Sequence, residues 1–331
     1  MAEIGRCEMI YKNGFVSLCK ANKKDLYRWL TQQLTSYYGK DHVVAKDGYL
    51  FCHGNIGVCL SAHIDTVFKQ PPYEFKFDGE IVSSPQGIGG DDRCGIYGVL
   101  YIMSEMEKKK QKPYIFLSTD EEVGGSTTKI GAKDCKDLAK GINFILALDR
   151  QGSVDSVYYQ CDNKEFKKWI DDHGFTEAQG TRTDICTLCD EWDVVGVNFS
   201  VGYYSNHTER ETVHLDELYV TLEKCMYIIN DMDPNKKFPF QKKAVTTSKQ
   251  YYYGGNQSIY DEEFMVNDNV FTKQYLVRAY KEPIYNSTCL FEIPAYTSLR
   301  ISAISGTWCK VEYKGKYGWV NQFNLLLNYY T

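Results

Sequence analysis

The sequence of 331 residues lacks long hydrophobic runs and an excess of positive charge. No apolar stretch approaches the roughly 20 residues of a membrane-spanning helix. The first twenty residues mix charged and apolar side chains and so lack a signal-peptide core. The net charge of -5 disfavours nucleic acid and anionic membrane surfaces as partners. These absences predict a cytoplasmic, globular protein without nucleic-acid or membrane partners, and its 43% apolar residues can form a sizeable core.

The sequence also lacks the two cysteine pairs of a four-cysteine zinc site. Its 12 cysteines are scattered, mostly within apolar stretches, which is typical of buried thiols in a reducing compartment. Cys186 and Cys189 have Cys-x-x-Cys spacing, but no second pair and no flanking redox motif accompanies them. We therefore expect both cysteines to be structural.

Residues 1–234 have the pattern of an α/β domain. A strand is predicted near Phe15 to Cys19, and a helix follows from Lys23 to Tyr38. Further strands are predicted at 49–52, 58–62, 114–117, 144–148 and 197–201, and further helices up to Lys108 and over 163–173 and 215–230. Because strands alternate with helices, we expect a mainly parallel sheet covered by helices on both faces.

The composition changes after Pro234. Residues 235–268 are rich in lysine, threonine, serine and tyrosine without a helical period, and we interpret them as a linker. Residues 269–331 contain short β-rich runs separated by turns, among them one at Ile284 and Tyr285. This pattern predicts a small all-β barrel.

Polar groups follow the buried strands of the first part. They are His63 and Asp65, Asp91 and Asp92, the run Asp120, Glu121 and Glu122, Asp149, and His207. Each alone has an ordinary explanation: a histidine at a strand end is common, and an aspartate at a helix start is a favourable cap. Three adjacent carboxylates directly after a buried strand repel one another, however, and a bound cation would relieve that repulsion. Carboxyl ends of parallel strands meet at one edge, where such sheets bind ligands.

The set His63, Asp91, Glu122, Asp149 and His207 supplies two imidazoles and three carboxylates. These donors suit two divalent cations that share a carboxylate, with Zn²⁺ as the first expectation and Co²⁺ or Mn²⁺ as alternatives. Such a centre activates water and polarises a carbonyl, so amide hydrolysis is the natural reaction. Glu121 would then serve as general base, and Asp65 would orient the imidazole of His63.

The motifs resemble, in order, those of the co-catalytic di-zinc exopeptidases. They are His-x-Asp-Thr-Val (63–67), Gly-Gly-Asp-Asp-x-x-Gly (89–95), Asp-Glu-Glu-x-Gly (120–124), a strand ending in Asp149, and His-Thr-x-x-Glu (207–211). That clan includes peptidase T, the carboxypeptidase G type, acylamino acid deacylases and zinc aminopeptidases. The resemblance implies that Asp91 bridges two metals, that His63 and Asp149 hold one, and that Glu122 and His207 hold the other.

The short segment between Asp149 and His207 distinguishes the branches of this clan. Peptidase T and carboxypeptidase G relatives insert a lid domain there, for which this chain has no room. The organisation resembles the single-domain aminopeptidases, so we expect an aminopeptidase acting on short peptides. The alternatives are an N-acyl amino acid deacylase, a carboxypeptidase, a peptidoglycan stem-peptide hydrolase and a non-catalytic peptide-binding protein. Tyr203, Tyr204 and Asn206 are candidates for pocket lining or for packing.

The C-terminal part resembles bacterial SH3-like domains. It contains Trp308-x-Lys-Val-x-Tyr, Gly315-Lys and Gly318-Trp-Val in the expected order. The resemblance implies a cell-wall peptide as a partner, and an accessory barrel that only packs is an equal alternative. A role at the wall would require release by lysis or a phage context.

Overall fold

The computed structural model describes residues 12–180, 183–243, 266–267, 269–272, 277–283, 287–294, 297–305, 308–321 and 324–327. The chain divides into two compact units, Met1–Lys242 and Lys243–Thr331. Among the described residues, no helix combines the length and the apolar character that crossing a bilayer requires.

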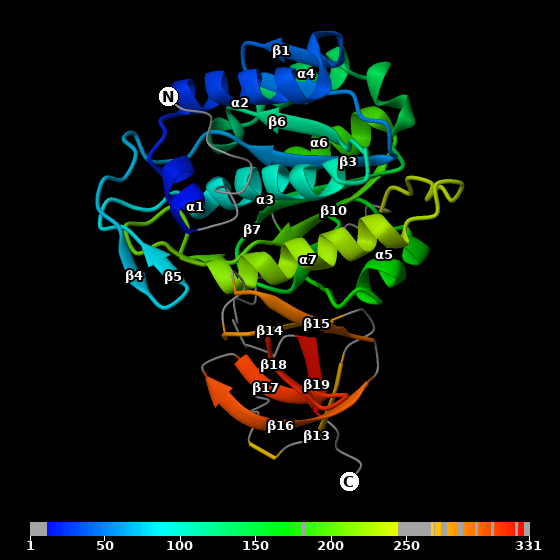
Figure 1. Ribbon diagram of the computed structural model, residues 1–331. Coiled ribbons are helices and arrows are strands. Elements are labelled where there is room, and N and C mark those ends of the chain that lie inside the picture. The colour runs from blue at the N-terminus through cyan, green and yellow to red at the C-terminus, as the bar shows by residue number, and fades with distance from the viewer. Residues whose placement is uncertain are drawn as a thin grey trace, which may run out of the picture. The chain divides into compact units, whose positions relative to one another are not determined.

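The first unit contains helices and strands in alternation (Figure 1). Its described α-helices are α1 (Lys12–Cys19), α2 (Lys23–Tyr38), α3 (Gly90–Glu107), α4 (Ser126–Asp134), α5 (Lys164–Asp171), α6 (Asp184–Trp192) and α7 (Leu215–Asp231). Its described strands are β1 (Val43–Lys46), β2 (Tyr49–Cys52), β3 (Val58–His63), β4 (Lys76–Asp78), β5 (Ile81–Ser83), β6 (Tyr114–Ser118), β7 (Phe144–Arg150), β8 (Asp155–Val157), β9 (Thr176–Glu177), β10 (Val195–Ser200), β11 (Tyr203–Tyr204) and β12 (Thr212–His214).

The N-terminal prediction was wrong in one element. The stretch around Phe15 to Cys19 is the helix α1, with Phe15, Leu18 and Cys19 buried. Their spacing of three and four residues places them on one helical face, whereas a short apolar run also fits a strand. The next helix was predicted correctly: Asn22 caps α2 by accepting a hydrogen bond from the backbone N–H of Asp25 (2.9 Å), and Gly39 follows its last residue.

The main sheet has the strand order β1-β2-β6-β3-β7-β10-β8-β9. The four central strands, β6, β3, β7 and β10, are parallel. The pairs β1–β2, β2–β6 and β10–β8 are antiparallel, and β9 pairs parallel with β8. The predicted mainly parallel α/β fold is thus confirmed. A smaller sheet of order β11-β12-β5-β4 accompanies it.

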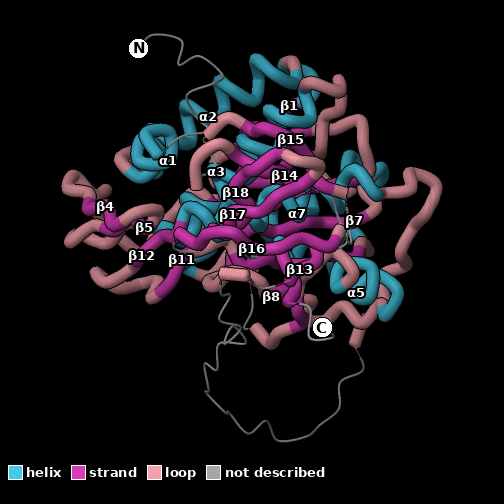
Figure 2. Tube along the Cα trace, turned by 60° about the horizontal axis from the view of Figure 1, so that its bottom comes forward, coloured by secondary structure: helices cyan, strands magenta, loops and turns pink. Residues whose placement is uncertain are grey.

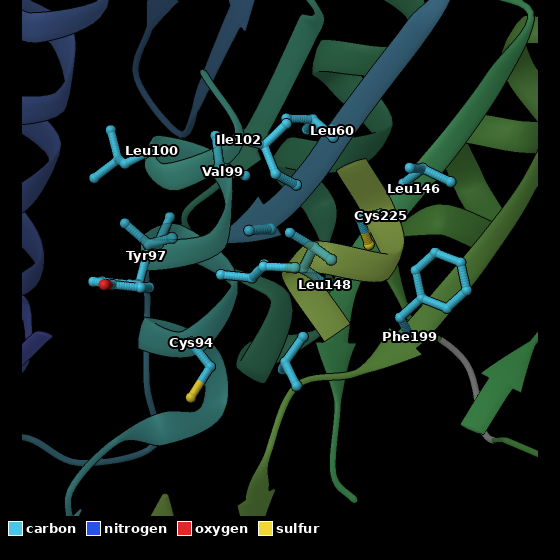
Figure 3. Packing of buried hydrophobic residues seen from close by; sticks show 14 of the residues in the cluster. Leu60, Cys94, Tyr97, Val99, Leu100, Ile102, Leu146, Leu148, Phe199 and Cys225 are labelled. Atoms are coloured by element: carbon cyan, nitrogen blue, oxygen red, sulfur yellow. The ribbon is translucent and has the colours of Figure 1, made fainter. Parts of the chain in front are cut away.

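Helices cover both faces of the main sheet, as predicted. One face packs Leu60 and Leu146 against residues of α3 and α7 such as Val99 and Cys225 (Figure 3). The other face packs its aromatic side chains against α4 and α6. Figure 1 shows α3 and α7 in front of the strands and α6 behind them. Because both faces are covered, the central strands β3, β6, β7 and β10 are buried over almost their whole length.

No separate domain interrupts the described residues between Asp149 and His207. That segment forms β8, α5, β9, α6 and β10, all within the first unit. The absence of an inserted lid domain, predicted from the length of the segment, is confirmed for these residues. Cys186 and Cys189 lie in α6, and neither forms a disulfide with a described residue.

The first unit extends past Pro234. Phe238 is buried and contacts Phe166 and Trp169, with ring centroids 5.2 and 5.4 Å apart. The predicted linker, 235–268, therefore starts with residues that pack on this unit. Its positions 244–265 lie outside the described residues.

The second unit contains one all-antiparallel sheet of order β15-β14-β18-β17-β16-β13-β19, which agrees with the predicted small β domain (Figure 2). Its strands are β13 (Asn269–Thr272), β14 (Val277–Tyr280), β15 (Cys289–Ile293), β16 (Ser298–Ser305), β17 (Trp308–Tyr313), β18 (Lys316–Asn321) and β19 (Leu325–Leu327). The run predicted at Ile284 and Tyr285 lies outside the described residues.

Candidate metal centre

Parallel pairing brings the predicted site residues to one edge of the sheet. β6, β3 and β7 are neighbours, so their carboxyl ends lie side by side. His63 ends β3, Asp149 lies near the end of β7, and the short 3₁₀-helix η3 (Glu121–Val123) follows β6. Asp91 opens α3, and His207 lies in the loop between β11 and β12. Five separate chain segments thus converge.

Asp91 lies between the two histidines. Its Oδ1 is 3.0 Å from His63 Nε2, and its Oδ2 is 3.2 Å from His207 Nε2. Each histidine also faces another carboxylate: His63 Nε2 is 3.5 Å from Asp149 Oδ1, and His207 Nε2 is 3.0 Å from Glu122 Oε2. The arrangement has two halves that share one aspartate.

Asp65 connects His63 to the Glu121–Glu122 turn. Its Oδ1 lies 3.4 Å from His63 Nδ1, the ring nitrogen on the side away from Asp91. Both carboxylate oxygens accept backbone hydrogen bonds of 3.2 Å, one from Glu121 and one from Glu122. The backbone carbonyl oxygen of Asp65 lies closer to His63 Nδ1, at 3.1 Å. Asp65 thus contacts both the imidazole of His63 and the turn that carries Glu121.

Asp92 has a different environment from Asp91. The peptide bond between them is cis. Asp92 accepts hydrogen bonds from the backbone N–H groups of His63 (3.0 Å) and Gly95 (2.8 Å). Ligand atoms of His63, Asp92 and Asp149 lie within 4.8 Å of one another, as do those of His63, Asp91 and Glu122. Both oxygens of Asp92 thus accept backbone hydrogen bonds, whereas those of Asp91 face the two histidines.

Gly95, the last residue of the Gly-Gly-Asp-Asp-x-x-Gly motif, allows the start of α3 to approach the sheet. A Cβ atom there would lie 2.4 Å from the carbonyl oxygen of Leu148 and 2.3 Å from Asp92 Oδ2. Both distances are far below van der Waals contact. The glycine is thus needed to bring Asp91 and Asp92 next to the end of β7.

Glu211 ends the His-Thr-x-x-Glu motif but was not predicted to have a role in the site. It is fully buried and accepts hydrogen bonds from the backbone N–H groups of Gly89 (2.9 Å) and Asp91 (3.0 Å). It therefore anchors the backbone of the central aspartate. Its place at the end of His-Thr-x-x-Glu was the one available signal, but spacing alone does not reveal a backbone partner. Asn206 also contacts Asp91, donating to its Oδ2 at 2.8 Å.

Tyr203 and Tyr204, the two candidates for pocket lining, differ in their contacts. Tyr203 is buried and donates a hydrogen bond to Asp149 Oδ1 at 3.3 Å. The hydroxyl of Tyr204 donates to Glu217, on α7, at 2.5 Å. Tyr203 thus reaches the centre, whereas Tyr204 packs away from it.

Burial raises the pKa values of three carboxylates of the centre, whereas hydrogen bonds from His207 and His63 lower the pKa of Asp91. Burial, followed by the charge of Asp149, raises the pKa of Glu121 to about 8. Burial and Asp91 raise the pKa of Glu122 to about 7, and burial raises that of Asp149 to about 6. The hydrogen bond to Asp91 is the main cause that raises the pKa of His207 to about 9. The protein groups alone thus favour extra protons here, which is the environment that a cation would stabilise.

Glu122 supplies an independent test of a bound cation. Its side chain is 7% exposed, and its buried Oε1 has no hydrogen-bond partner among the described residues. A buried carboxylate oxygen without a donor is costly, and coordination of a cation would compensate it. The donor set, two imidazoles and three carboxylates, matches the preferences of zinc and of similar divalent ions. The residues present therefore fit a metal centre.

The fold of the chain is similar to that of peptidases of known structure. No protein-family model matches the sequence, and no curated protein matches it. The aminopeptidase PepT from Bacillus cereus is 14% identical, with a TM-score of 0.55 over 68% of this chain and 98% of that chain.

Two further solved structures have a similar fold at similarly low sequence identity. A TET aminopeptidase from a marine-sediment Thaumarchaeota archaeon is 12% identical, with a TM-score of 0.53 over 69% of this chain and 97% of that chain. A tripeptidase from Staphylococcus aureus is 13% identical, with a TM-score of 0.51 over 66% of this chain and 96% of that chain. At these identities the similarity shows a shared fold.

Proposed function

We propose that this protein is a metal-dependent hydrolase of amide bonds in short peptides, acting as an aminopeptidase. The observation that carries the proposal is Asp91, whose two oxygens face two histidines, each paired with a further carboxylate. The peptidase fold of the solved structures supports it. The peptide substrate and the aminopeptidase direction follow those neighbours and the sequence motifs.

In this proposal the five donors hold two divalent cations, with zinc expected. His63 and Asp149 would hold one, Glu122 and His207 the other, and Asp91 both. When bound, such a pair of cations lowers the pKa of water and polarises the scissile carbonyl. The donors come mainly from strand ends and helix starts of one compact unit, which holds them in fixed positions.

Glu121 is the proposed general base. It follows β6 directly, and Asp65 holds its backbone N–H. Its carboxylate would accept a proton from the attacking water and return it to the leaving amine. Burial and the charge of Asp149 raise the pKa of Glu121 to about 8 in the metal-free protein. Bound cations would lower that pKa and so favour the ionised form, which is the form that accepts a proton from water.

The proposal is tested with the zinc-loaded protein, a library of short peptides and mass spectrometry of the products. Loss of single residues from amino termini supports the aminopeptidase, and loss from carboxyl termini moves the proposal to a carboxypeptidase. A chelated sample controls for metal dependence. No cleavage of any peptide by zinc-, cobalt- or manganese-loaded protein would contradict the proposal.

Glu121→Gln separates the base from the metal ligands. This variant should lose hydrolysis by at least ~10²-fold, since general acid–base catalysis contributes about 10²–10⁴-fold. Its metal content, measured by elemental analysis, should stay at the wild-type value. Glu209→Gln, an exposed carboxylate in the loop of His207, is the matched control and should keep full activity. Unchanged activity in Glu121→Gln would remove the assigned base.

For the second unit, an SH3-like barrel that binds cell-wall peptides remains a prediction from its sequence motifs. Its all-antiparallel sheet is compatible with such a barrel. Co-sedimentation of the full chain with purified peptidoglycan tests it, and Trp319→Ala should weaken the binding. Absence of any co-sedimentation would favour an accessory role.

A further inference from the structure

A cavity of about 500 Å³ adjoins the metal centre. Its volume lies in the range of ~300–1,000 Å³ that is usual for small-molecule sites. Asp65 and Glu122 line it on the side of the centre, and Asn22, Lys23, Lys69 and Arg93 line it elsewhere. Substrate held at the centre therefore has this cavity next to it.

The charged groups of the cavity fall into two sets. The carboxylates, Asp65 and Glu122, are engaged by the centre itself: Asp65 contacts His63, and Glu122 contacts His207. The cations, Lys23, Lys69 and Arg93, have no such role. Away from the centre the cavity is thus lined by positive charge, although the whole chain has a net charge of -5.

Arg93 is buried, with 3% of its surface exposed. Its guanidinium donates hydrogen bonds to the backbone carbonyls of Leu18, Ala21 and Ile64. Among the described residues, the nearby carboxylates Asp65 and Asp92 act on it only through their charge. Carbonyl acceptors satisfy its N–H groups but carry no net charge. The buried guanidinium therefore adds one positive charge to the lining of the cavity, opposite in sign to Asp65 and Glu122.

The two lysines supply mobile donors at the cavity. The Nζ of Lys23 lies 3.3 Å from the carbonyl oxygen of Thr119, directly before the turn of Glu121 and Glu122. Lys69 is exposed and belongs to the loop after β3. An ammonium from the start of α2 and another from the loop after His63 can thus meet one anionic group, which the amino terminus of α2 also favours.

The remaining walls are apolar. Val67, Phe68 and Ile88 line the cavity together with Pro71 and Pro72. A ligand that fits combines an apolar body with a negative charge. A protonated amino terminus would be repelled by the cationic set, so this cavity suits the portion of a peptide on the carboxyl side of the scissile bond.

We propose that this cavity binds a substrate carboxylate, with the ammonium groups of Lys23 and Lys69 as its partners, and so selects short peptides that carry a negative charge beyond the scissile bond. The proposal rests on the proposed function. The carboxylate can be the free carboxyl terminus of a di- or tripeptide or an acidic side chain. Long peptides without such a charge are then poor substrates.

The test compares Ala-Ala-Ala with its carboxyl-terminal amide. The wild-type protein should show a kcat/KM for the acid at least ~10-fold above that for the amide, the factor expected of a charge-assisted hydrogen bond. Lys23→Gln and Lys69→Gln should each lower this ratio toward one. Lys24→Gln is the matched control, since Lys24 is the next residue of α2 and does not line the cavity; it should keep the wild-type ratio.

The amide of Ala-Asp-Ala distinguishes the two sources of the carboxylate. Cleavage as fast as that of the free acid would assign the cavity to an acidic side chain, and slow cleavage to the carboxyl terminus. Calorimetric binding of the acid and the amide to Glu121→Gln gives a readout without turnover. Tighter binding of the acid, lost in the additional Lys69→Gln change, supports the proposal.

The proposal and the proposed function fail in different ways. Equal turnover and equal binding of acid and amide would overturn the carboxylate cavity and leave the peptidase intact. Absence of turnover with every peptide would overturn the peptidase. In that case, acid-selective binding would still support the cavity.

Discussion

The two halves of the candidate centre differ in how the chain holds them. His63 lies at the end of a buried strand, and its side chain is 2% exposed. His207 lies in a loop with a left-handed backbone (φ 63°), and its side chain is 49% exposed. Their partners differ less, since Asp149 and Glu122 are both largely buried. One half belongs to the core of the fold, and the other is assembled on its surface.

Because of this difference, we expect substitutions in the two halves to have different effects on the stability of the protein and similar effects on its activity. Removing His63 from the strand-borne half leaves buried carboxylates without their partner, whereas removing His207 from the loop-borne half changes mainly the site. Groups of the buried half interact in a medium of low polarity, where each missing partner is costly. In the other half, the exposed imidazole of His207 is screened by water. The predictions below test this contrast.

The largest contrast is expected between His63→Ala and His207→Ala. Both should reduce peptide hydrolysis by at least ~10²-fold, because each removes a proposed ligand, and even outer partners of metal ligands are worth 10–100-fold. His63→Ala should also lower the free energy of unfolding by ~3–5 kcal/mol, the usual cost of breaking a buried ion pair. His207→Ala should lower it by about 1 kcal/mol or less. Chemical denaturation of the chelated proteins measures the difference.

His42→Ala is the control for these variants. His42 is an exposed histidine of a 3₁₀-helix (Lys40–His42) and should be dispensable for both readouts. An equal loss of stability in His63→Ala and His207→Ala would show that the two halves contribute equally to the stability of the fold, contrary to the prediction. Full activity in His207→Ala would remove that residue from the centre.

The strand-borne half was also the easier half to predict. β3, β6 and β7 are continuous apolar runs, and the polar residues after them stand out in the sequence. Because the central strands are parallel, their carboxyl ends lie at one edge of the sheet, so the proximity of His63 and Asp149 follows from the pattern alone. Their convergence needs no knowledge of loop structure.

The loop-borne half required more than pattern. The position of His207 depends on a turn and on the small sheet of β11 and β12, neither of which has a strong periodic signal. Its inclusion rested on the resemblance of motifs. Glu211 received no role because its partners are backbone N–H groups, which every residue carries. The helix α1 was missed because a five-residue apolar run fits both periods.

Glu211→Gln tests whether the loop half also positions the shared aspartate. The variant keeps the shape but weakens acceptance of the Gly89 and Asp91 hydrogen bonds, so Asp91 should be held less firmly. Metal affinity should fall about 10–100-fold, as for other groups that support a ligand without touching the ion. Metal titration monitored by calorimetry measures this, with Glu209→Gln as control. Restored kcat at saturating zinc would identify Glu211 as a positioning residue, whereas an unchanged affinity would deny it that role.

The smallest effect concerns the pH dependence of stability without metal. Burial raises the pKa of Glu121 to about 8, and those of Glu122 and Glu211 to about 7. Between pH 5 and 8 the folded protein then binds more protons than the unfolded chain, so the free energy of unfolding falls as pH rises. His207, with its pKa raised to about 9, acts in the same direction, because its stabilisation is complete below its unfolded pKa and is lost toward pH 9.

The chelated protein should therefore melt at least ~3 °C lower at pH 8 than at pH 5.5, the shift that about 1 kcal/mol produces in a chain of this size. Zinc should abolish or reverse the trend, because cation binding favours the ionised carboxylates. Glu121→Gln removes one of the titrating carboxyl groups and should make the melting temperature of the chelated protein depend less on pH. A melting temperature that rises with pH, or a slope that zinc leaves unchanged, would show that the clustered carboxylates do not control stability. The groups that titrate lie in the turn after β6 and in the loop of His207. The slope of the melting temperature against pH therefore reports how strongly ionisation in this half of the centre affects the stability of the fold.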